Sequence, residues 1–374
     1  MINFGRTNTD RLALWWRNID KLLFISIIFL MFLGIFFAYT STSNIASERI
    51  YKTDHFLIIK HIFFALISFL ILSSLSLLDA KQIEKYCILG FIITAFLLLL
   101  VLIFGVEVKG SKRWINLIFF RFQPIEVYKP FFVLLCSLII SNSQIGDLKL
   151  RIFYSFCVLF FSLLLLLNQP DVGQSLLIFS VWLILIFVSG ISIALLISLG
   201  LAIFVGISST LLLFNERFSY IFRRLKTFID PSKGDNLQTQ KALESIKQGG
   251  FTGRGIGEGI LKERVPEAHT DFVLAVIGEE FGILMILIIF LIITFIFLRV
   301  YSQCDTENNL FRKLVLIGLS CLVYLQSIIN LGVTLNILPN KGMTFPFISY
   351  GGSSMIGSGI IFGILLCFTK KKLT

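Results

Sequence analysis

Long apolar segments, separated by short polar ones, make up most of this chain of 374 residues. An apolar helix needs about 20 residues to cross the hydrocarbon core of a bilayer, and most of these segments approach that length. We predict ten membrane-spanning helices, at about residues 21–40, 56–78, 86–106, 127–140, 152–168, 174–189, 191–213, 272–298, 313–335 and 347–369. The predicted fold class is therefore an all-α polytopic membrane protein, with residues 1–374 forming one membrane domain.

Lysine and arginine residues follow the second, fourth and eighth predicted helices, as in the short loops that stay on the cytoplasmic side of a membrane. They also precede the first helix and lie at the end of the chain. We therefore expect both termini, residues 1–20 and 370–374, to be cytoplasmic, with the charged start leading into an uncleaved membrane anchor. One large loop, residues 214–271 between the seventh and eighth helices, is then expected on the periplasmic side.

Composition agrees with the membrane class and argues against two other kinds of protein. The chain is 56% hydrophobic and 15% charged, with a mean hydropathy of +0.89. A net charge of +11 would suit a nucleic-acid-binding protein, but most basic residues lie in loops between the predicted helices, so no nucleic acid is expected as a partner. The six cysteines are scattered and form no C-x-x-C pair, so neither a disulfide nor a zinc site is expected.

The short loop after the third helix carries Lys112, Arg113 and Trp114 in the motif G-S-K-R-W-I. Its basic residues lie on the side of the membrane where such residues are disfavoured. One explanation is that the tryptophan and the basic side chains anchor the loop at the membrane edge. The other is a cationic cradle for a phosphate on the outer face, with Trp114 packing on a sugar or a prenyl group.

The next motif, F-Q-P-I-E-V-Y-K, begins the fourth helix and contains Gln123 and two charged residues. Glu126 and Lys129 are three residues apart, so they share a helix face and can form an ion pair that neutralises two buried charges. The pair can also hold Lys129 toward a cavity. Asp171 lies in the turn N-Q-P-D-V-G, where it can cap the next helix or contribute to a site.

An aspartate at the start of the eighth helix is the strongest candidate for catalysis. The motif V-P-E-A-H-T-D-F contains Glu267, His269 and Asp271 and leads directly into the apolar helix. Ionisable groups in hydrocarbon cost a few kcal/mol or more each, so they tend to mark functional sites. The alternative is that Asp271 only caps the helix, where a carboxylate suits the helix dipole.

Two further carboxylates, Glu279 and Glu280, lie inside the same helix. Glu279 is about 80° around the helix from Asp271 and Glu280 is nearly opposite, so we expect Glu279 to share the cavity of the aspartate. In the large loop before this helix, residues 238–248 are predicted to be helical. The glycine run that follows, at 253–259, would let the backbone approach a ligand closely.

The segment at 338–354 contains two prolines and the run G-G-S-S, which do not suit a regular membrane helix. Such backbone is tolerated at membrane depth where it lines a wet cavity or is buried in protein. We therefore take Lys341 and Ser349 as candidates for substrate contact. Small residues also permit close helix packing, which is the alternative explanation.

Seven of these motifs, in this order, resemble the SEDS family of bacterial cell-wall polymerases, named for shape, elongation, division and sporulation. They are G-S-K-R-W-I (110–115), F-Q-P-x-E-x-x-K (122–129), Q-P-D-V-G (169–173), G-x-G-x-G (253–257), V-P-E-A-H-T-D-F (265–272), I-G-E-E-F-G (277–282) and P-F-I-S-Y-G-G-S-S (346–354). The residues P-N-K-G at 339–342 resemble the division member of the family more than its elongation member. Ile125 and Gly259 depart from the residues that are common in the family at these positions.

The resemblance implies a peptidoglycan glycosyltransferase that polymerises lipid II on the periplasmic face of the bacterial plasma membrane, at the division septum. The essential aspartate of the family falls on Asp271, which we expect to act as the catalytic base. The functional Arg-Trp pair of the family falls on Arg113 and Trp114. The residues expected to bind substrate are Lys112, Arg113, Trp114, Gln123, Glu126, Lys129, Asp171, Arg217, Glu267, His269, Glu279, Lys341 and Ser349.

Undecaprenyl pyrophosphate leaves in this reaction, and fixed cations would stabilise its charge. We expect Lys112 and Arg113 in that role, with Lys129 or Arg217. A divalent cation, Mg²⁺ or Mn²⁺, could share it, although no metal-ligand spacing in the sequence demands one. The resemblance also implies a partner, a class B penicillin-binding protein whose anchor helix lies against the eighth and ninth helices, together with other septal division proteins.

Two other functions use the same features. A lipid II flippase would use the charged residues within the membrane as a relay and the glycine-rich last helix as a broken helix. Against it, the chain shows no inverted repeat, and its charged motifs gather toward the outer side rather than the middle of the membrane. A scaffold whose large loop docks and activates a partner is the third hypothesis. A RodA-like polymerase of cell elongation is the alternative within the family.

Overall fold

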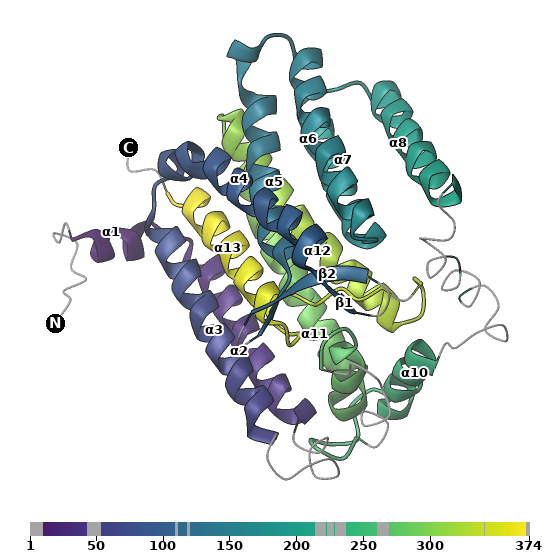
Figure 1. Cartoon of the computed structure of the whole chain (residues 1–374). Coiled ribbons are helices and arrows are strands. Elements are labelled where there is room, and N and C mark those ends of the chain that lie inside the picture. Colours follow the sequence, from purple (N-terminus) through teal and green to yellow (C-terminus); the bar gives the residue numbers. More distant parts are fainter. Residues whose placement is uncertain are drawn as a thin grey trace.

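The computed structural model describes residues 10–42, 54–108, 111–117, 120–213, 237–259, 269–339 and 341–371, together with residues 222 and 228. Helices dominate this part of the chain (Figure 1). They are α1 (Arg11–Asn18), α2 (Lys21–Thr42), α3 (Asp54–Leu77), α4 (Ala80–Phe104), α5 (Pro124–Ser141), α6 (Leu148–Asn168), α7 (Val172–Val188), α8 (Ile193–Leu213), α10 (Leu237–Gly249), α11 (Val273–Cys304), α12 (Leu310–Thr334) and α13 (Gly352–Phe368), with a short 3₁₀ helix η1 (Ser143–Ile145).

Among the described residues, seven helices are long and apolar enough to cross a membrane: α2, α3, α4, α5, α6, α11 and α12. Three shorter apolar stretches lie in α7, α8 and α13. Large apolar side chains such as Phe32, Leu70, Ile103 and Leu291 are exposed on the outside of the bundle, as suits a surface in contact with lipid. The polytopic membrane fold is thus confirmed, while the number of ten crossings and their sidedness stay predictions.

The bundle has an enclosed centre and a loosely held edge. In the apolar stretches of α5 and α12, 78% and 67% of the residues are buried inside the protein, whereas in those of α3 and α11 only 28% are. Helix α13 packs between α3 and α5, and α12 packs against α5, α7 and α11. Helix α8 packs on α7 and stands at one side of the bundle (Figure 1). Side chains on α5 and α12 are therefore placed in the protein interior rather than in lipid.

Two predicted helix starts were wrong for identifiable reasons. Helix α4 begins at Ala80 rather than at 86, because the side chain of Gln82 accepts a hydrogen bond from the Asp79 N–H at 3.0 Å in a capping box. Helix α13 begins at Gly352 rather than at 347. Phe347 has a φ of 62°, which a continuing right-handed helix does not allow.

A small sheet corrects the all-α prediction. Strands β1 (Val106–Val108), β2 (Ser111–Asn116) and β3 (Arg121–Phe122) pair in antiparallel order between α4 and α5. These strands are short and lie in what the sequence pattern indicated as a loop, so alternation over a few residues was too weak to reveal them. The sheet makes β2, with its Lys-Arg-Trp motif, a defined platform instead of a loop.

The two ends of the described chain lie on the same side of the bundle, away from β1, β2 and α10 (Figure 1). Here Arg299 donates a hydrogen bond to Asp20 at 2.8 Å, and the Lys371 N–H donates to the Asn18 carbonyl at 3.0 Å. The short helix α1 was not predicted. Its Trp15 donates to Ser76 at 3.0 Å, which ties α1 to the end of α3.

Helix α11 is broken, which corrects the predicted continuous helix at 272–298. Gly282 has φ 78° and ψ 176°, a backbone conformation that glycine adopts readily. Backbone hydrogen bonds with the glycine-rich loop satisfy the polar groups exposed by the break: Arg254 N to Glu279 O (3.0 Å), Gly255 N to Glu280 O (3.1 Å) and Ile283 N to Gly250 O (3.0 Å). The close approach expected of the glycine run is thus made to the backbone of α11. The part before Gly282 is a short buried half-helix, packed against α10.

Candidate functional site

Asp271 lies half-buried just before α11. The N-cap position of α11 is held by Phe272, so Asp271 does not have the capping position that was its alternative role. Its carboxylate lies directly beside the backbone of Gly342, where an added Cβ would be 2.5 Å from Oδ2. Since Gly342 itself is exposed, the carboxylate is adjacent to a surface that a substrate can reach.

The residue before Gly342 connects this carboxylate to a second helix start. The side chain of Lys341 fills the space that a Cβ at Gly173 would need, so it lies against the first turn of α7. Only the absence of a side chain at Gly173 permits this placement. Lys341 and Gly342 therefore bridge Asp271 and the N-terminus of α7.

Asp171 at the start of α7 is joined to the sheet. Its side chain caps the helix by accepting from the Gln174 N–H at 3.4 Å, as the capping alternative predicts. The same carboxylate lies 3.6 Å from Nε of Arg113, and the Arg113 guanidinium also donates to the Pro170 carbonyl. These contacts hold β2 against α7.

Four motifs that are far apart in the sequence are thus linked by contact. Arg113 contacts Asp171, which lies two residues before Gly173. Lys341 contacts Gly173, and the next residue contacts the Asp271 carboxylate. The arrangement places a carboxylate, an ammonium and a guanidinium around one end of α7, as proton transfer near a developing anion requires.

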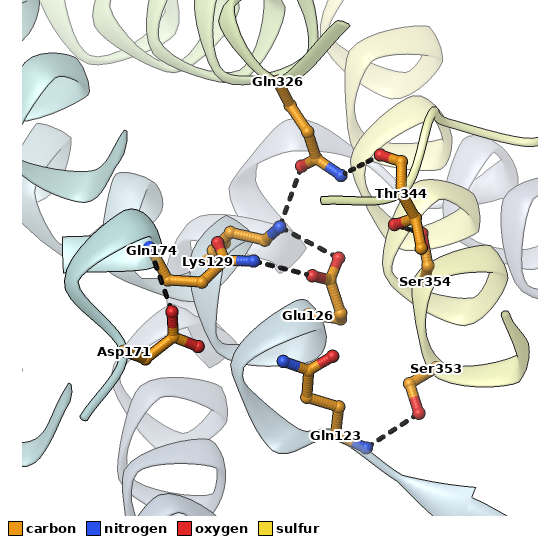
Figure 2. Close-up of polar contacts among 9 residues, drawn as sticks. All are labelled: Gln123, Glu126, Lys129, Asp171, Gln174, Gln326, Thr344, Ser353 and Ser354. Carbon is orange, nitrogen blue, oxygen red and sulfur yellow. Dashed lines mark hydrogen bonds and ion pairs between the residues drawn. The ribbon is translucent and has the colours of Figure 1, made fainter. Parts of the chain in front are cut away.

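The Glu126–Lys129 pair lies deeper in the bundle (Figure 2). Lys129 is fully buried, and its Nζ donates to Glu126 Oε2 at 2.9 Å and to Gln326 Oε1 at 2.8 Å. Gln174 donates to the other oxygen of Glu126 at 3.2 Å. The geometry favours the ion-pair alternative over a Lys129 that reaches into a cavity, because its ammonium is bonded inside the protein.

Other candidates have local partners. The N–H of Gln123 donates to Ser353 Oγ at 2.8 Å, which joins the start of α5 to α13 (Figure 2). Ser349 is buried, and its Oγ accepts from the Phe345 N–H at 2.8 Å. These contacts brace the segment before α13. A role of either residue in binding substrate stays a prediction.

His269 lies against the same segment. Its carbonyl accepts from the Tyr350 N–H at 2.9 Å, and the two rings are 5.9 Å apart in an edge-to-face arrangement. The ring of His61 stacks on Tyr350 at 6.0 Å. An aromatic stack thus supports the residues that precede Asp271.

The remaining candidates differ in how the structure places them. Lys112 is exposed on β2 opposite Glu107, and Trp114 is half-buried opposite Val106. Glu279 and Glu280 are both buried in the half-helix of α11. That Glu279 shares the cavity of Asp271 stays a prediction. Arg217 and Glu267, which were also predicted to bind substrate, lie outside the described residues.

Three polar residues of the site were not predicted from the sequence: Gln174, Gln326 and Asn330. Gln326 and Asn330 carry a signal that could have revealed them. They are four residues apart in an apolar span, so they share one helix face. Polar side chains within membrane helices usually face the bundle interior, where they bind other polar groups.

Comparison with known proteins covers nearly the whole chain. The profile of the cell cycle protein family FtsW, RodA and SpoVE matches residues 20–373. The chain is 33% identical over 370 residues to the probable peptidoglycan glycosyltransferase FtsW of Caulobacter vibrioides, covering 99% of this chain and 94% of that protein. It is 34% identical over 361 residues to the protein of the same name from Haemophilus influenzae, covering 93% and 89%.

Solved structures share the fold. A chain from a peptidoglycan synthase complex that coordinates polymerization and crosslinking superposes with a TM-score of 0.74, at 22% identity, covering 94% of this chain and 97% of that chain. The rod shape determining protein RodA of Thermus thermophilus gives a TM-score of 0.69, at 22% identity, covering 95% and 97%. Since the family profile and relatives above 30% identity extend over almost its full length, this chain belongs to the FtsW, RodA and SpoVE family of cell cycle proteins.

Proposed function

We infer that this chain is a peptidoglycan glycosyltransferase that polymerises lipid II into glycan strands for septal cell-wall synthesis. Its full-length similarity to proteins named FtsW supports both the reaction and the division role. The observation that carries the proposal is the contact series from Arg113 through Asp171 and Lys341 to the carboxylate of Asp271. It brings a base and two cations, Arg113 and Lys341, to one end of the bundle.

The reaction joins the glucosamine 4-hydroxyl of one lipid II to the muramyl C1 of the growing strand. Asp271 accepts the hydroxyl proton as the oxygen attacks C1. The bond from C1 to the pyrophosphate oxygen breaks, and undecaprenyl pyrophosphate leaves. Lys341, Arg113 and Lys112 lie on the Asp271 side of the molecule and supply positive charge for the departing anion. Lys129 is assigned to structure instead, because its ammonium is bonded within the bundle.

We assign the charge of the pyrophosphate to lysine and arginine. Among the described residues, no group of three or more His, Cys, Asp and Glu side chains could hold a metal ion. Mg²⁺ at phosphate substrates is usually bound by one or two carboxylates together with the phosphates. Polymerisation measured with and without a chelator tests the assignment: equal rates leave the charge to these residues alone, whereas a loss of rate adds a divalent cation carried with the substrate.

We place the site on the periplasmic face of the plasma membrane at the septum. The distribution of basic residues in short loops supports this orientation. We further propose that a class B penicillin-binding protein crosslinks the strands and that its anchor helix packs against α11 and α12, with other division proteins joining the complex. Exposed Leu284, Leu287 and Leu291 on α11 provide an apolar surface for such a helix.

The test is lipid II polymerisation by the purified chain with its crosslinking partner in detergent. Asp271→Asn is expected to abolish strand formation, whereas Asp147→Asn, at an exposed position before α6, is expected to leave it unchanged. Wild-type activity in Asp271→Asn would remove this carboxylate from the chemistry. Translocation of lipid II in vesicles, without polymer from any form of the complex, would favour a flippase instead.

A further inference from the structure

Two side-chain amides on α12 bind consecutive carbonyl groups of the segment that carries Lys341 and Gly342. Gln326 Nε2 donates to the Thr344 carbonyl at 2.8 Å (Figure 2), and Asn330 Nδ2 donates to the Met343 carbonyl at 2.5 Å. The two amides are one helical turn apart and so project from the same face of α12. They hold this irregular segment along the helix.

The orientation of the Asn330 amide follows from its partners. Both of them are backbone carbonyl oxygens, which only accept hydrogen bonds, so the NH₂ group must face them. The second partner is the carbonyl of Asp271, at 3.0 Å. One amide group therefore ties the backbone of the catalytic aspartate to the segment that touches its carboxylate.

Both amides are buried, so the loss of their hydrogen bonds cannot be compensated by water. Gln326 is 3% exposed, and Asn330 is 1% exposed. Removing the buried Asn330 donor takes a hydrogen bond from each of its two acceptors, at a cost in free energy. Movement of Asp271 relative to Gly342 relieves that cost, because Asp271 lies outside the regular helix and has room on its exposed side.

We propose that Asn330 is a positioning residue which, with Gln326, forms an amide clamp that sets the Asp271 carboxylate against the 341–344 segment. Gln326 extends the clamp inward, because its oxygen accepts from Lys129. Asn330 extends it outward to Asp271. The catalytic meaning of the clamp rests on the proposed function, in which Asp271 is the base. The geometric part, that Asn330 holds Asp271 in place, can be tested without activity.

The geometric test uses a cysteine in place of the aspartate. Asp271→Cys is introduced into a chain in which Cys157 and Cys321, the two native cysteines that are not buried, are replaced by serine. The rate of reaction with a membrane-impermeant maleimide is then measured. Asn330→Leu and the smaller Asn330→Ser are each expected to raise it several-fold, because the thiol is no longer held against Gly342. Ser327→Ala is the matched control, since this buried hydroxyl on α12 donates to the Val323 carbonyl of its own helix at 2.9 Å.

The catalytic test measures polymerisation by the full chain with its partner. Asn330→Leu and Asn330→Ser are expected to lower kcat about a hundredfold, the usual effect of misplacing a reacting group by about 1 Å. KM for lipid II is expected to change little, because Asn330 is buried and acts through Asp271. The melting temperature of each purified variant is measured alongside, and Ser327→Ala is expected to retain the wild-type kcat.

The outcomes separate the clamp from the function. An unchanged maleimide rate in both Asn330 variants overturns the clamp, whether or not the chain polymerises lipid II. An equal loss of kcat in Ser327→Ala also overturns it, since α12 would then be sensitive in general. The third outcome is a raised maleimide rate in the Asn330 variants together with a wild-type chain that forms no strands. This outcome would support the clamp and contradict the proposed function.

Discussion

Two ion pairs lie near the same end of the bundle but differ in how deeply they are buried. In the inner pair, the side chains of Lys129 and Glu126 are 0% and 7% exposed, with 2.9 Å between the charged atoms. In the outer pair, the side chains of Arg113 and Asp171 are 16% and 4% exposed, with 3.6 Å between Arg113 Nε and Asp171 Oδ2. The inner cation is enclosed by protein, whereas the outer one borders a surface.

The difference shows which charges can serve a substrate. Taking a lysine and a glutamate out of water is costly unless further hydrogen bonds satisfy both groups. Gln326 and Gln174 supply those bonds to the inner pair. In the outer pair, the Pro170 carbonyl binds Arg113 and the Gln174 N–H binds Asp171, and the Arg113 side chain is 16% exposed. We therefore expect substitutions in the inner pair to change stability and those near the outer pair to change substrate handling.

The largest effect is expected from breaking the inner pair. Lys129→Met leaves Glu126 buried without its countercharge, which should lower the free energy of unfolding by about 3–5 kcal/mol. Thermal unfolding of the purified protein measures this. The double variant with Glu126→Gln should recover part of the loss, since no charge then remains at the site. A Lys129→Met protein as stable as wild type, yet unable to polymerise, would contradict the division between the two pairs.

Gly342→Ala tests the outer side directly. An added Cβ would meet Asp271 Oδ2 at 2.5 Å, so the carboxylate must shift. We expect kcat to fall about a hundredfold, as for other misplacements of a reacting group, with little loss of stability at this exposed position. Gly206→Ala is the control, because nothing lies within 4 Å of its added Cβ. Equal kcat values for the two variants would show that the Asp271–Gly342 contact is unimportant.

Arg113→Lys should have a smaller effect, confined to substrate binding. A lysine keeps the charge but cannot bind the Asp171 carboxylate and the Pro170 carbonyl with one planar group, so β2 is held less firmly. We expect KM for lipid II to rise several-fold and the melting temperature to change little. Steady-state polymerisation at varied lipid II concentration gives KM. A large fall in the melting temperature would instead show that Arg113, like the inner pair, mainly stabilises the fold.

Lys112→Ala should have the smallest effect. This side chain is exposed on β2, so its attraction to an anionic substrate is screened by salt. We expect a modest rise in KM at low ionic strength that disappears at high ionic strength. The same kinetic assay at two salt concentrations measures this. A rise that persists at high salt would indicate a direct, dehydrated contact with pyrophosphate.

Much of the helical framework and the candidate residues could be predicted from apolar runs and motifs. The Glu126–Lys129 pair followed from spacing alone, because residues three apart share a helix face. The helix predicted at 238–248 is confirmed as α10. The break at Gly282 could not be predicted, because the hydrogen bonds that make it tolerable come from residues about 30 positions earlier in the chain. Nor could the sheet, whose strands are too short to show a period.

The amino-acid sequence was sufficient to indicate a membrane bundle and to mark Asp271 as a candidate, since hydrophobicity and local spacing act on neighbouring residues. Only the folded chain could bring Lys341 against Gly173, Gly342 against Asp271 and the Asn330 amide between two carbonyls. These contacts join segments distant in sequence, and they depend on the space left by absent side chains and on the direction of hydrogen bonds. Such properties belong to the packed structure, because no local pattern records which distant atoms will meet.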